Sequence, residues 1–329
     1  MRGRLDSAPV AAVLLVIATF SWAGNHAIAR ATHAHVPPWS LNFARWLIVA
    51  VVMGVVAAPA LRRDWRLIIA HAPVLTFLGV IGCGVFGTLQ YVGLKYTGAL
   101  NMGVFNSVAP AFIALASFLI FRDAVGFVQM LGIAISLSGV LAIVTRLDLD
   151  NLMSMSFNGG DLILVLNMGL WAIYSACLRL RPPIASTSFL FAMAVPAALV
   201  TAPMAAVEYA EVLQLAPDIE TIGTVLYAGF ITSMLSYICW GRGVATLGVA
   251  RAGAFLHLVP LFGTLLATTL LGEQFGLHHL AGLALILFGV TLAVRRTAKR
   301  KKQRRGKASK ARSRPRPPAS AAGLAGRTA

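Results

Sequence analysis

Polar and aromatic side chains that lie inside apolar stretches are the residues of this sequence most able to do chemistry. Asn25 and His26 follow Trp22 by three and four residues, so in a helix the three share one face. Trp171 and Tyr174 repeat this spacing in the second half of the chain. Hydroxyls and amides gain nothing by facing lipid, so we interpret these faces as walls of a cavity that binds a small polar solute. The alternative is a belt of aromatic residues at the lipid interface.

A larger set of polar and aromatic residues lies around these two faces, and we predict that it contacts the substrate. Its members are Trp22, Asn25, His26, Tyr91, Asn106, Trp171, Tyr174, Tyr237, Trp240 and His257. A histidine in a membrane helix is also a common packing hydrogen-bond donor, so both roles stay open for His257. Because no predicted span carries Asp or Glu away from its ends, only His26 and His257 could titrate near neutral pH within the spans. Transport is then facilitated diffusion or is coupled through a histidine.

Arg45 is the one charged residue that we place inside a span rather than at its rim. A buried arginine costs roughly 2.5–3.5 kcal/mol at a helix centre on insertion scales, and less near the edge. It is therefore a candidate anchor for a substrate carboxylate. The alternative is that the side chain extends outward to water.

Pro110 and Pro260 each lie about halfway along an apolar stretch. Proline has no N–H to bond the carbonyl four residues earlier, so Asn106 and Leu256 lose a backbone partner. Freed backbone at membrane depth is tolerated only against protein or water. We predict that both prolines are hinges facing a central cavity, with an ordinary packing kink as the alternative.

Two stretches of the chain, 98–144 and 248–294, match without a gap at an offset of 150 residues. The matched positions include both prolines, and Ser107 corresponds to His257. Each copy contains an apolar segment with a proline, a short acidic turn and a second apolar segment with two glycines seven residues apart. A repeat this long suits a duplicated membrane half rather than a solenoid.

The composition requires a lipid environment, since the chain is 58% hydrophobic and 12% charged with a mean hydropathy of +0.79. A segment of about 20 apolar residues can cross the hydrocarbon core as a helix. We predict ten such spans, at about 10–29, 40–58, 73–93, 101–121, 125–145, 161–178, 188–207, 222–240, 250–271 and 277–294. The predicted fold class is an all-α integral membrane protein of ten transmembrane helices. Five helices per half is an odd number, so the two repeats are inverted.

The distribution of Lys and Arg predicts that both termini are cytoplasmic, because these residues concentrate in alternate loops. Fourteen of the 28 lie in residues 295–329, which contain no Asp or Glu. That tail is expected to be disordered and attracted to anionic lipid headgroups. The expected domains are a cytoplasmic N-terminus at 1–9, a first repeat at 10–145, a periplasmic connecting loop at 146–159, a second repeat at 160–294 and the basic tail at 295–329.

Other function classes find little support in the sequence. The basic tail lacks the interleaved aromatics of a nucleic-acid surface, so no nucleic-acid partner is expected. Cys83, Cys177 and Cys239 lie in apolar runs without C-x-x-C spacing, and His278-His279 has no nearby carboxylate beyond Glu273, so neither a metal nor another cofactor is expected. The sequence has no G-x-S-x-G or H-E-x-x-H motif, and we predict that it is not an enzyme.

Several short motifs, in order over ten spans, resemble the EamA-type permeases of the drug/metabolite transporter superfamily. They are Trp22-Ala23-Gly24-Asn25, Arg45-Trp46, Asn106 through Pro110 with Phe121-Arg122-Asp123, Gly160-Asp161 with Trp171, Trp240-Gly241-Arg242-Gly243, and Arg251-Ala252-Gly253 through His257, Pro260 and Leu271-Gly272-Glu273. The resemblance covers residues 10–294. Asp123 stands where members of the family often have Glu, and the basic tail lies outside the family pattern.

The resemblance implies a bacterial inner-membrane transporter with two five-helix halves, a central cavity and export of small metabolites such as amino acids. The expected mechanism is alternating access, and the expected ligand is an amino-acid-sized solute between the Trp22/Asn25 and Trp171/Tyr174 faces. Efflux of hydrophobic drugs or nucleotide-like compounds is the alternative within transport. A membrane enzyme is the alternative outside it.

Overall fold

The computed structural model describes residues 7–32, 36–96, 106–148, 150, 153, 159–211, 218–271 and 276–294. Within these ranges all regular structure is helical, and nine helices are long and apolar enough to cross a membrane. A shorter apolar helix, Ala109–Phe121, makes the tenth, so the predicted all-helical, ten-span fold is confirmed. The expectations for the basic tail, for residues 1–6, for most of the connecting loop and for Glu273 lie outside the described residues.

The first half contains five spans and one surface helix. The helices are α2 (Ala8–Thr32), α3 (Pro38–Val56), α4 (Ala58–Ala70), α5 (Ala72–Gly79), the π-helix η1 (Val80–Val85), α6 (Phe86–Tyr96), α8 (Ala109–Phe121) and α9 (Phe127–Thr145). The segments α5, η1 and α6 form one continuous span.

The second half has the same order of spans. The helices are α11 (Gly159–Cys177), the 3₁₀ turn η2 (Leu178–Leu180), α12 (Ser186–Glu211), α13 (Ile219–Leu226), the π-helix η3 (Tyr227–Leu235), α14 (Ser236–Leu247), α15 (Val249–Ala254), the 3₁₀ turn η4 (Phe255–His257), α16 (Leu258–Leu271) and α17 (Leu277–Val294). Here α13, η3 and α14 form one span, and α15, η4 and α16 form another.

The last helices of the two halves, α9 and α17, pack against each other through four glycines. A Cβ on Gly132 would lie 2.6 Å from the Gly289 carbonyl oxygen, and one on Gly139 would lie 2.8 Å from that of Gly282. The low-numbered glycine of each helix therefore meets the high-numbered glycine of the other, which requires antiparallel helices. Since α9 and α17 are equivalent in the repeat, this contact shows that the halves are inverted.

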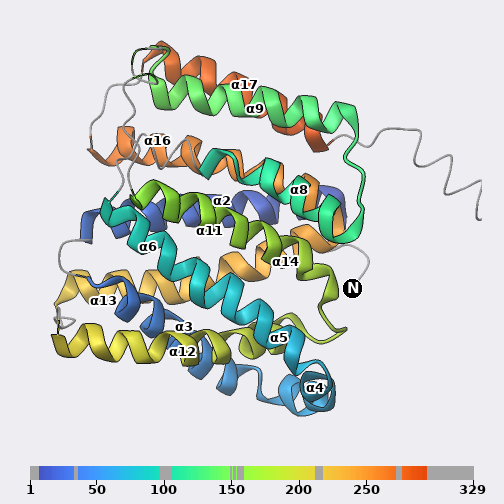
Figure 1. Ribbon diagram of the computed structural model, residues 1–329, viewed down its shortest axis with the longest axis vertical. Helices are drawn as coiled ribbons and strands as arrows, with labels where there is room; N and C mark the ends of the chain where they lie inside the picture. Colours follow the sequence, from blue (N-terminus) through green and yellow to red (C-terminus); the bar gives the residue numbers. More distant parts are fainter. Residues whose placement is uncertain are drawn as a thin grey trace, which may run out of the picture. The chain divides into compact units, whose positions relative to one another are not determined.

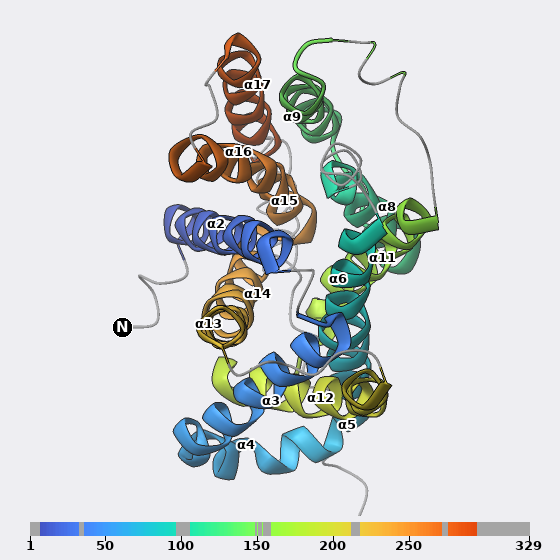
Figure 2. The ribbon, with the colours of Figure 1, turned by 90° about the vertical axis from the view of Figure 1, so that its left-hand side faces the viewer.

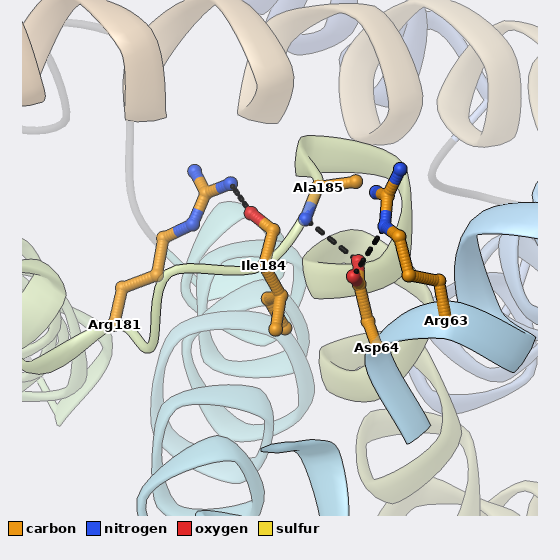
Figure 3. Close-up of polar contacts among 5 residues, drawn as sticks. All are labelled: Arg63, Asp64, Arg181, Ile184 and Ala185. Atoms are coloured by element: carbon orange, nitrogen blue, oxygen red, sulfur yellow. Dashed lines mark hydrogen bonds and ion pairs between the residues drawn. The ribbon is translucent and has the colours of Figure 1, made fainter. Parts of the chain in front are cut away.

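The second helices of the two halves, α3 and α12, form another antiparallel pair, and an acid contacts the start of each: Asp64 of α4 at the start of α12, and Glu208 of α12 at the start of α3. Asp64 accepts a hydrogen bond from the Ala185 backbone N–H at 2.8 Å, next to the first turn of α12 (Figure 3). Glu208 accepts from the Ser40 backbone N–H at 2.8 Å and from its hydroxyl at 3.0 Å, in the first turn of α3. Backbone N–H groups at a helix start lack intrahelical partners, so each carboxylate satisfies one.

The remaining spans lie in two stacks between these pairs. Figures 1 and 2 show α9 and α17 at one edge and α3, α12 and α4 at the other. One stack contains α2, α14 and α16, and the other contains α6, α8 and α11, each with helices from both halves. Every helix of one stack has its repeat equivalent in the other stack.

The helix α4 is a feature that the sequence reasoning missed. Its thirteen residues include Arg62, Arg63 and Arg66, so the segment is too short and too charged to be one of the apolar spans. Trp65 and Ile69 are more than half exposed, which is typical of an amphipathic helix lying in the interface plane.

Candidate functional site

A cavity lies between the two stacks, with about 70 Å³ of free space at its centre. Eight of the residues predicted from the sequence line it: Trp22, Asn25, His26, Arg45, Tyr91, Asn106, Trp171 and Tyr237. The sequence reasoning missed the other lining residues, namely Phe86, Gly87, Gln90, Ala109, Met168, Thr232, Leu256 and Val259. We call this space the central cavity. Its volume suits a few water molecules, so a larger solute requires the helices to separate.

Arg45 is the only charged side chain in the described lining of the central cavity, and it is buried at 3% exposure. Its Nε donates to the Ser233 hydroxyl at 2.8 Å and its Nη1 donates to the Tyr91 hydroxyl at 2.8 Å. Tyr91 in turn donates to Asn25 Oδ1 at 3.1 Å. These partners are neutral, so the positive charge has no counterion among them. The guanidinium carbon also lies 5.2 Å from the Trp46 ring centre, a cation–π distance.

The π-helices η1 and η3 occupy equivalent places in the two halves; η3 contributes Thr232 to the cavity wall, and η1 directly precedes the lining residues Phe86 and Gly87 of α6. Their wider turns free backbone carbonyls, which side chains from other helices satisfy. Trp46 Nε1 donates to the Cys83 carbonyl at 2.8 Å, and Asn42 Nδ2 donates to that of Gly84 at 2.7 Å. In η3, Trp22 Nε1 donates to the Thr232 carbonyl at 3.3 Å. The bond to Thr232 anchors the turn that carries Ser233, and the bonds to Cys83 and Gly84 anchor the start of the span that continues into α6, which carries Tyr91.

Five aromatic side chains close one side of the central cavity: Trp22, Trp171, Tyr174, Tyr237 and Trp240. We call them the aromatic barrier. Trp171 lies within 6.0 Å of each of the other four, measured between ring centroids. Tyr174 and Trp240 are at most 1% exposed and do not line the cavity. The solute space expected between the faces of Trp22 and Trp171 is therefore filled by their direct contact.

A second, larger cavity of about 850 Å³ lies on the other side of the aromatic barrier. On α11, Trp171 lines the central cavity and Ser175 lines the second one, a single turn further along. On α14, Tyr237 likewise lines the central cavity, and Gly241, one turn further along, lines the second one. We call this second space the vestibule. Its charged lining residues in the described chain are Arg179, Arg181 and Arg242.

Hydrogen bonds and charges at the vestibule end of the molecule shift two ionisable groups that lie outside the spans. The Arg63 side chain and the Ala185 backbone N–H, both hydrogen-bonded to Asp64, lower the pKa of its carboxyl (Figure 3). Burial lowers the pKa of Arg181, and the like charge of Arg242 adds to this effect, against an opposing contribution from Tyr174. The loop that joins α11 to α12 is thus bound to α4 through Asp64 and Ala185.

His257 is fully buried and lies outside the described lining of the central cavity. Its Nε2 lies 2.7 Å from the Ser107 carbonyl oxygen, and its Nδ1 contacts the Ser136 hydroxyl. A carbonyl only accepts, so Nε2 carries the proton and donates. The ring thus joins its own repeat equivalent, Ser107, to α9. This geometry favours the packing role that the sequence left open.

The two predicted hinge prolines follow breaks in their helices. Pro260 is the third residue of α16, which directly follows the 3₁₀ turn η4, and Leu256, four residues before the proline, is within that turn. Pro110 is the second residue of α8, which begins after a turn at Val108. Neither ring lines the central cavity, although neighbouring Ala109 and Val259 do. Hinge motion at the prolines stays a prediction.

Comparison with known proteins decides the family. Residues 9–145 and 158–295 each match the EamA-like transporter family. The chain belongs to the EamA-like transporter family. This EamA-like chain is therefore a multi-pass membrane transporter, and each match covers five of its spans.

Several relatives of this EamA-like chain extend over most of its length. A probable terminal-alkyne amino-acid exporter of Streptantibioticus cattleyicolor is 24% identical over 88% of this chain and 95% of its own. A probable amino-acid metabolite efflux pump of Salmonella typhimurium is 26% identical over 87% and 97%. An uncharacterized transporter of Bacillus subtilis is 28% identical over 66% and 71%.

A solved structure agrees with the fold. A crystal structure of a protein with 19% sequence identity superposes with a TM-score of 0.68, covering 87% of this chain and 97% of its own. At this identity the likeness concerns the fold alone.

Proposed function

We propose that this EamA-like protein exports small metabolites that carry a carboxylate, with amino acids and related solutes as the substrate class. The observation that carries the proposal is Arg45, a buried charge inside a membrane span with only neutral hydrogen-bond partners among the described residues. A charge in such a place marks a binding site by default, because leaving it unpaired costs several kcal/mol. A substrate carboxylate supplies the missing counterion.

The rest of the central cavity fits the remainder of an amino acid. Phe86, Met168, Leu256 and Val259 offer an apolar wall for a side chain. Asn106 offers an amide oxygen that can accept from an ammonium group, and the Nε2 of Gln90, whose Oε1 accepts from Asn167 Nδ2 at 3.0 Å, can donate to a further polar group of the solute. The two relatives whose names contain amino-acid export support this substrate class.

Alternating access follows from the inverted halves. In the structure the aromatic barrier closes the central cavity toward the vestibule. The inverted repeat supplies a second arrangement of equivalent helices, in which the opposite end closes instead. Separation of Trp22 from Trp171 is the opening step that this mechanism requires.

We place the protein in the bacterial inner membrane with both termini in the cytoplasm, which puts the vestibule on the cytoplasmic side. The basis is the excess of arginine at that end of the spans, among them Arg62, Arg63 and Arg66 of α4, Arg181 of the loop that joins α11 to α12, and Arg242 near the end of α14. Labelling single cysteines placed in α4 from either side of the membrane tests this orientation. The tail at 295–329 would then meet the anionic headgroups of the inner leaflet.

Transport proceeds by facilitated diffusion or by coupling to protons through a histidine. His26 is the candidate for coupling, because it lines the central cavity while both ring nitrogens of His257 are engaged in packing. Flux measured against pH in a His26→Gln variant tests coupling through this residue. An unchanged pH dependence assigns facilitated diffusion or places the coupling elsewhere.

Counterflow in proteoliposomes tests the function. The panel consists of L-leucine, L-phenylalanine and L-threonine, their decarboxylated amines, and a nucleoside and a cationic drug. We expect counterflow of an amino acid and none of its amine. Counterflow of the drug or the nucleoside alone favours the alternative class of efflux substrates, which the apolar wall of the cavity also fits. Hydrolysis of a lipid without any counterflow contradicts transport.

A further inference from the structure

The vestibule is lined by three arginines, and among the described residues only one of them is paired with a carboxylate. Arg179 is paired with Asp123, which also accepts a hydrogen bond from Ser117. Arg181 and Arg242 have no acidic partner among the described residues. The two guanidinium groups therefore repel each other in a space of about 850 Å³ that contains no described carboxylate lining.

Arg181 is held in place so that part of its guanidinium remains available. Its Nη2 donates to the Ile184 carbonyl at 3.0 Å, as Figure 3 shows, and to the Ser186 hydroxyl at 3.2 Å. The guanidinium carbon also lies 4.5 Å from the Phe189 ring centre. Its Nη1 is directed toward the opposite wall, where it lies 4.0 Å from the place that a Cβ on Gly241 would take. Arg242, the next residue on that wall, is exposed to the vestibule.

An immobilised guanidinium group with free donors, facing a second positive charge in a recessed space, is the chemistry that recognises a carboxylate or phosphate. We propose that the vestibule is a second anion-binding site, at which Arg181 and Arg242 hold the carboxylate of the substrate before it passes the aromatic barrier to Arg45. This inference rests on the proposed transport of a carboxylate-bearing solute. An anionic lipid headgroup has the same chemistry, and the experiment must separate the two sources.

The charge of the vestibule can be measured without knowing the substrate. Ala245 lines the vestibule and is exposed, so Ala245→Cys places a thiol there. The native cysteines Cys83, Cys177 and Cys239 are buried, so the parent chain serves as the blank. The reaction rates of the introduced thiol with an anionic and a cationic methanethiosulfonate reagent are compared. We expect the anionic reagent to react faster, because the local potential concentrates it.

Adding Arg242→Gln should lower the ratio of anionic to cationic reaction rates about fivefold. Adding Arg62→Gln, which removes an exposed arginine of α4 outside the vestibule, should leave the ratio unchanged. An equal ratio in the parent Ala245→Cys chain and the Arg242→Gln variant overturns the proposal. Both variants alter solvent-exposed side chains, and size-exclusion profiles check that they fold.

Protection experiments then identify the occupant. L-leucine should slow modification of the thiol introduced by Ala245→Cys, whereas its decarboxylated form, 3-methylbutylamine, should not. Slowing by phosphatidylglycerol in the vesicles, with no effect of L-leucine, would make the vestibule a lipid headgroup site and overturn the proposal. In transport, Arg242→Gln should raise the KM for L-leucine about fivefold from the vestibule side only, with kcat unchanged.

The two proposals fail in different ways. If no amino acid shows counterflow, the proposed function fails, whatever the ratio of reagent rates. If L-leucine is transported but Arg242→Gln changes neither the rate ratio nor the KM from the vestibule side, the vestibule site alone is wrong. An equal rise of KM from both sides also contradicts it, because the two arginines would then act on the central cavity.

Discussion

Trp22 and Trp171, which occupy corresponding places in the two halves, meet edge to face with their ring centroids 5.2 Å apart and their planes at 89°. The contact is formed by two copies of one ancestral position, and it closes the path between the central cavity and the vestibule. Edge-to-face pairs are worth about 0.5–1.5 kcal/mol beyond their buried area, so separating this pair has a modest energetic cost. The barrier can therefore be both closed in this structure and opened during transport.

Replacement of Arg45 should remove the preference for carboxylates. Arg45→Gln deletes the charge, and because hydrogen bonds to charged groups contribute about 1.5–3 kcal/mol, we expect the KM for L-leucine to rise roughly 10- to 100-fold. Tyr91→Phe, which removes one neutral partner of the guanidinium, should raise the KM only a few-fold. Proteoliposome uptake measures both constants. A parent-like KM in Arg45→Gln would contradict the proposed anchor.

Truncation of Tyr174 should make the aromatic barrier leak. The ring is 1% exposed and packs against Trp171 and Tyr237, so Tyr174→Ala opens space between the central cavity and the vestibule. We expect faster efflux of preloaded L-leucine in the absence of external substrate. Tyr209→Ala, at a half-exposed tyrosine of α12, is the control and should behave as the parent. Equal efflux from both variants would show that Tyr174 does not contribute to the barrier.

A methyl group at the contact of α9 and α17 should destabilise the protein. The Cβ of Gly139→Ala would lie 2.8 Å from backbone atoms of Gly282 and Ile286, which cannot move aside as a side chain could. Overpacking of this kind costs about 1–3 kcal/mol, so the midpoint of thermal unfolding in detergent should fall. Gly169→Ala is the matched control, because nothing lies within 4 Å of its Cβ. A helical glycine replaced without a clash should be neutral or stabilising by up to about 1 kcal/mol.

The contribution of Asp64 to stability should depend on pH. Its pKa is lowered in the folded protein, so its stabilising contribution is present above the unfolded pKa of about 3.9 and is lost as the pH falls through the lower folded value. Asp64→Asn should thus lower the unfolding midpoint at pH 7, and the difference from the parent should shrink below about pH 4. Asp148→Asn, at an exposed aspartate, is the control and should leave the unfolding midpoint at pH 7 unchanged. A pH-independent difference for Asp64→Asn would point to packing instead of charge.

His257 should matter for stability more than for the pH dependence of transport. The ring joins Ser107 and Ser136, so His257→Ala removes two buried hydrogen bonds, each worth about 0.5–1.5 kcal/mol. We expect a lower unfolding midpoint with an unaltered pH profile of the remaining flux. A parent-like midpoint combined with a flattened pH profile would reverse this assignment and make His257 the coupling residue.

The fold was predictable because it is repeated in the sequence. The offset of 150 residues that relates Ser107 to His257 aligned the prolines and glycines, and an odd number of spans per half implied the inversion. Helical spacing likewise identified Trp22, Asn25 and His26 as one face, and all three line the central cavity. Both the repeat and the helical spacing are patterns within one sequence, so they can be read without knowing any contact between segments.

What the sequence could not provide depends on contacts between distant segments. Tyr174 and Trp240 each follow a cavity-lining residue of the same helix, Trp171 or Tyr237, by only three residues. A shift of less than one helical turn therefore decides whether such a residue lines the cavity or lies in the barrier. The π-helices carry no local sequence signal, because the side chains that bond the free carbonyls of η1, Asn42 and Trp46, come from another helix. The roles of Asp64 and Glu208 depend on helix starts more than a hundred residues away.

The reciprocal glycine contact has an evolutionary consequence. Gly132 meets Gly289 while Gly139 meets Gly282, so the same surface patch serves both partners, as in an isologous interface between two subunits. The single chain therefore has the internal geometry of a homodimer whose protomers were inserted in opposite directions. A half-length chain with this patch would be self-complementary, and a fusion of two copies would need only to preserve the pairing.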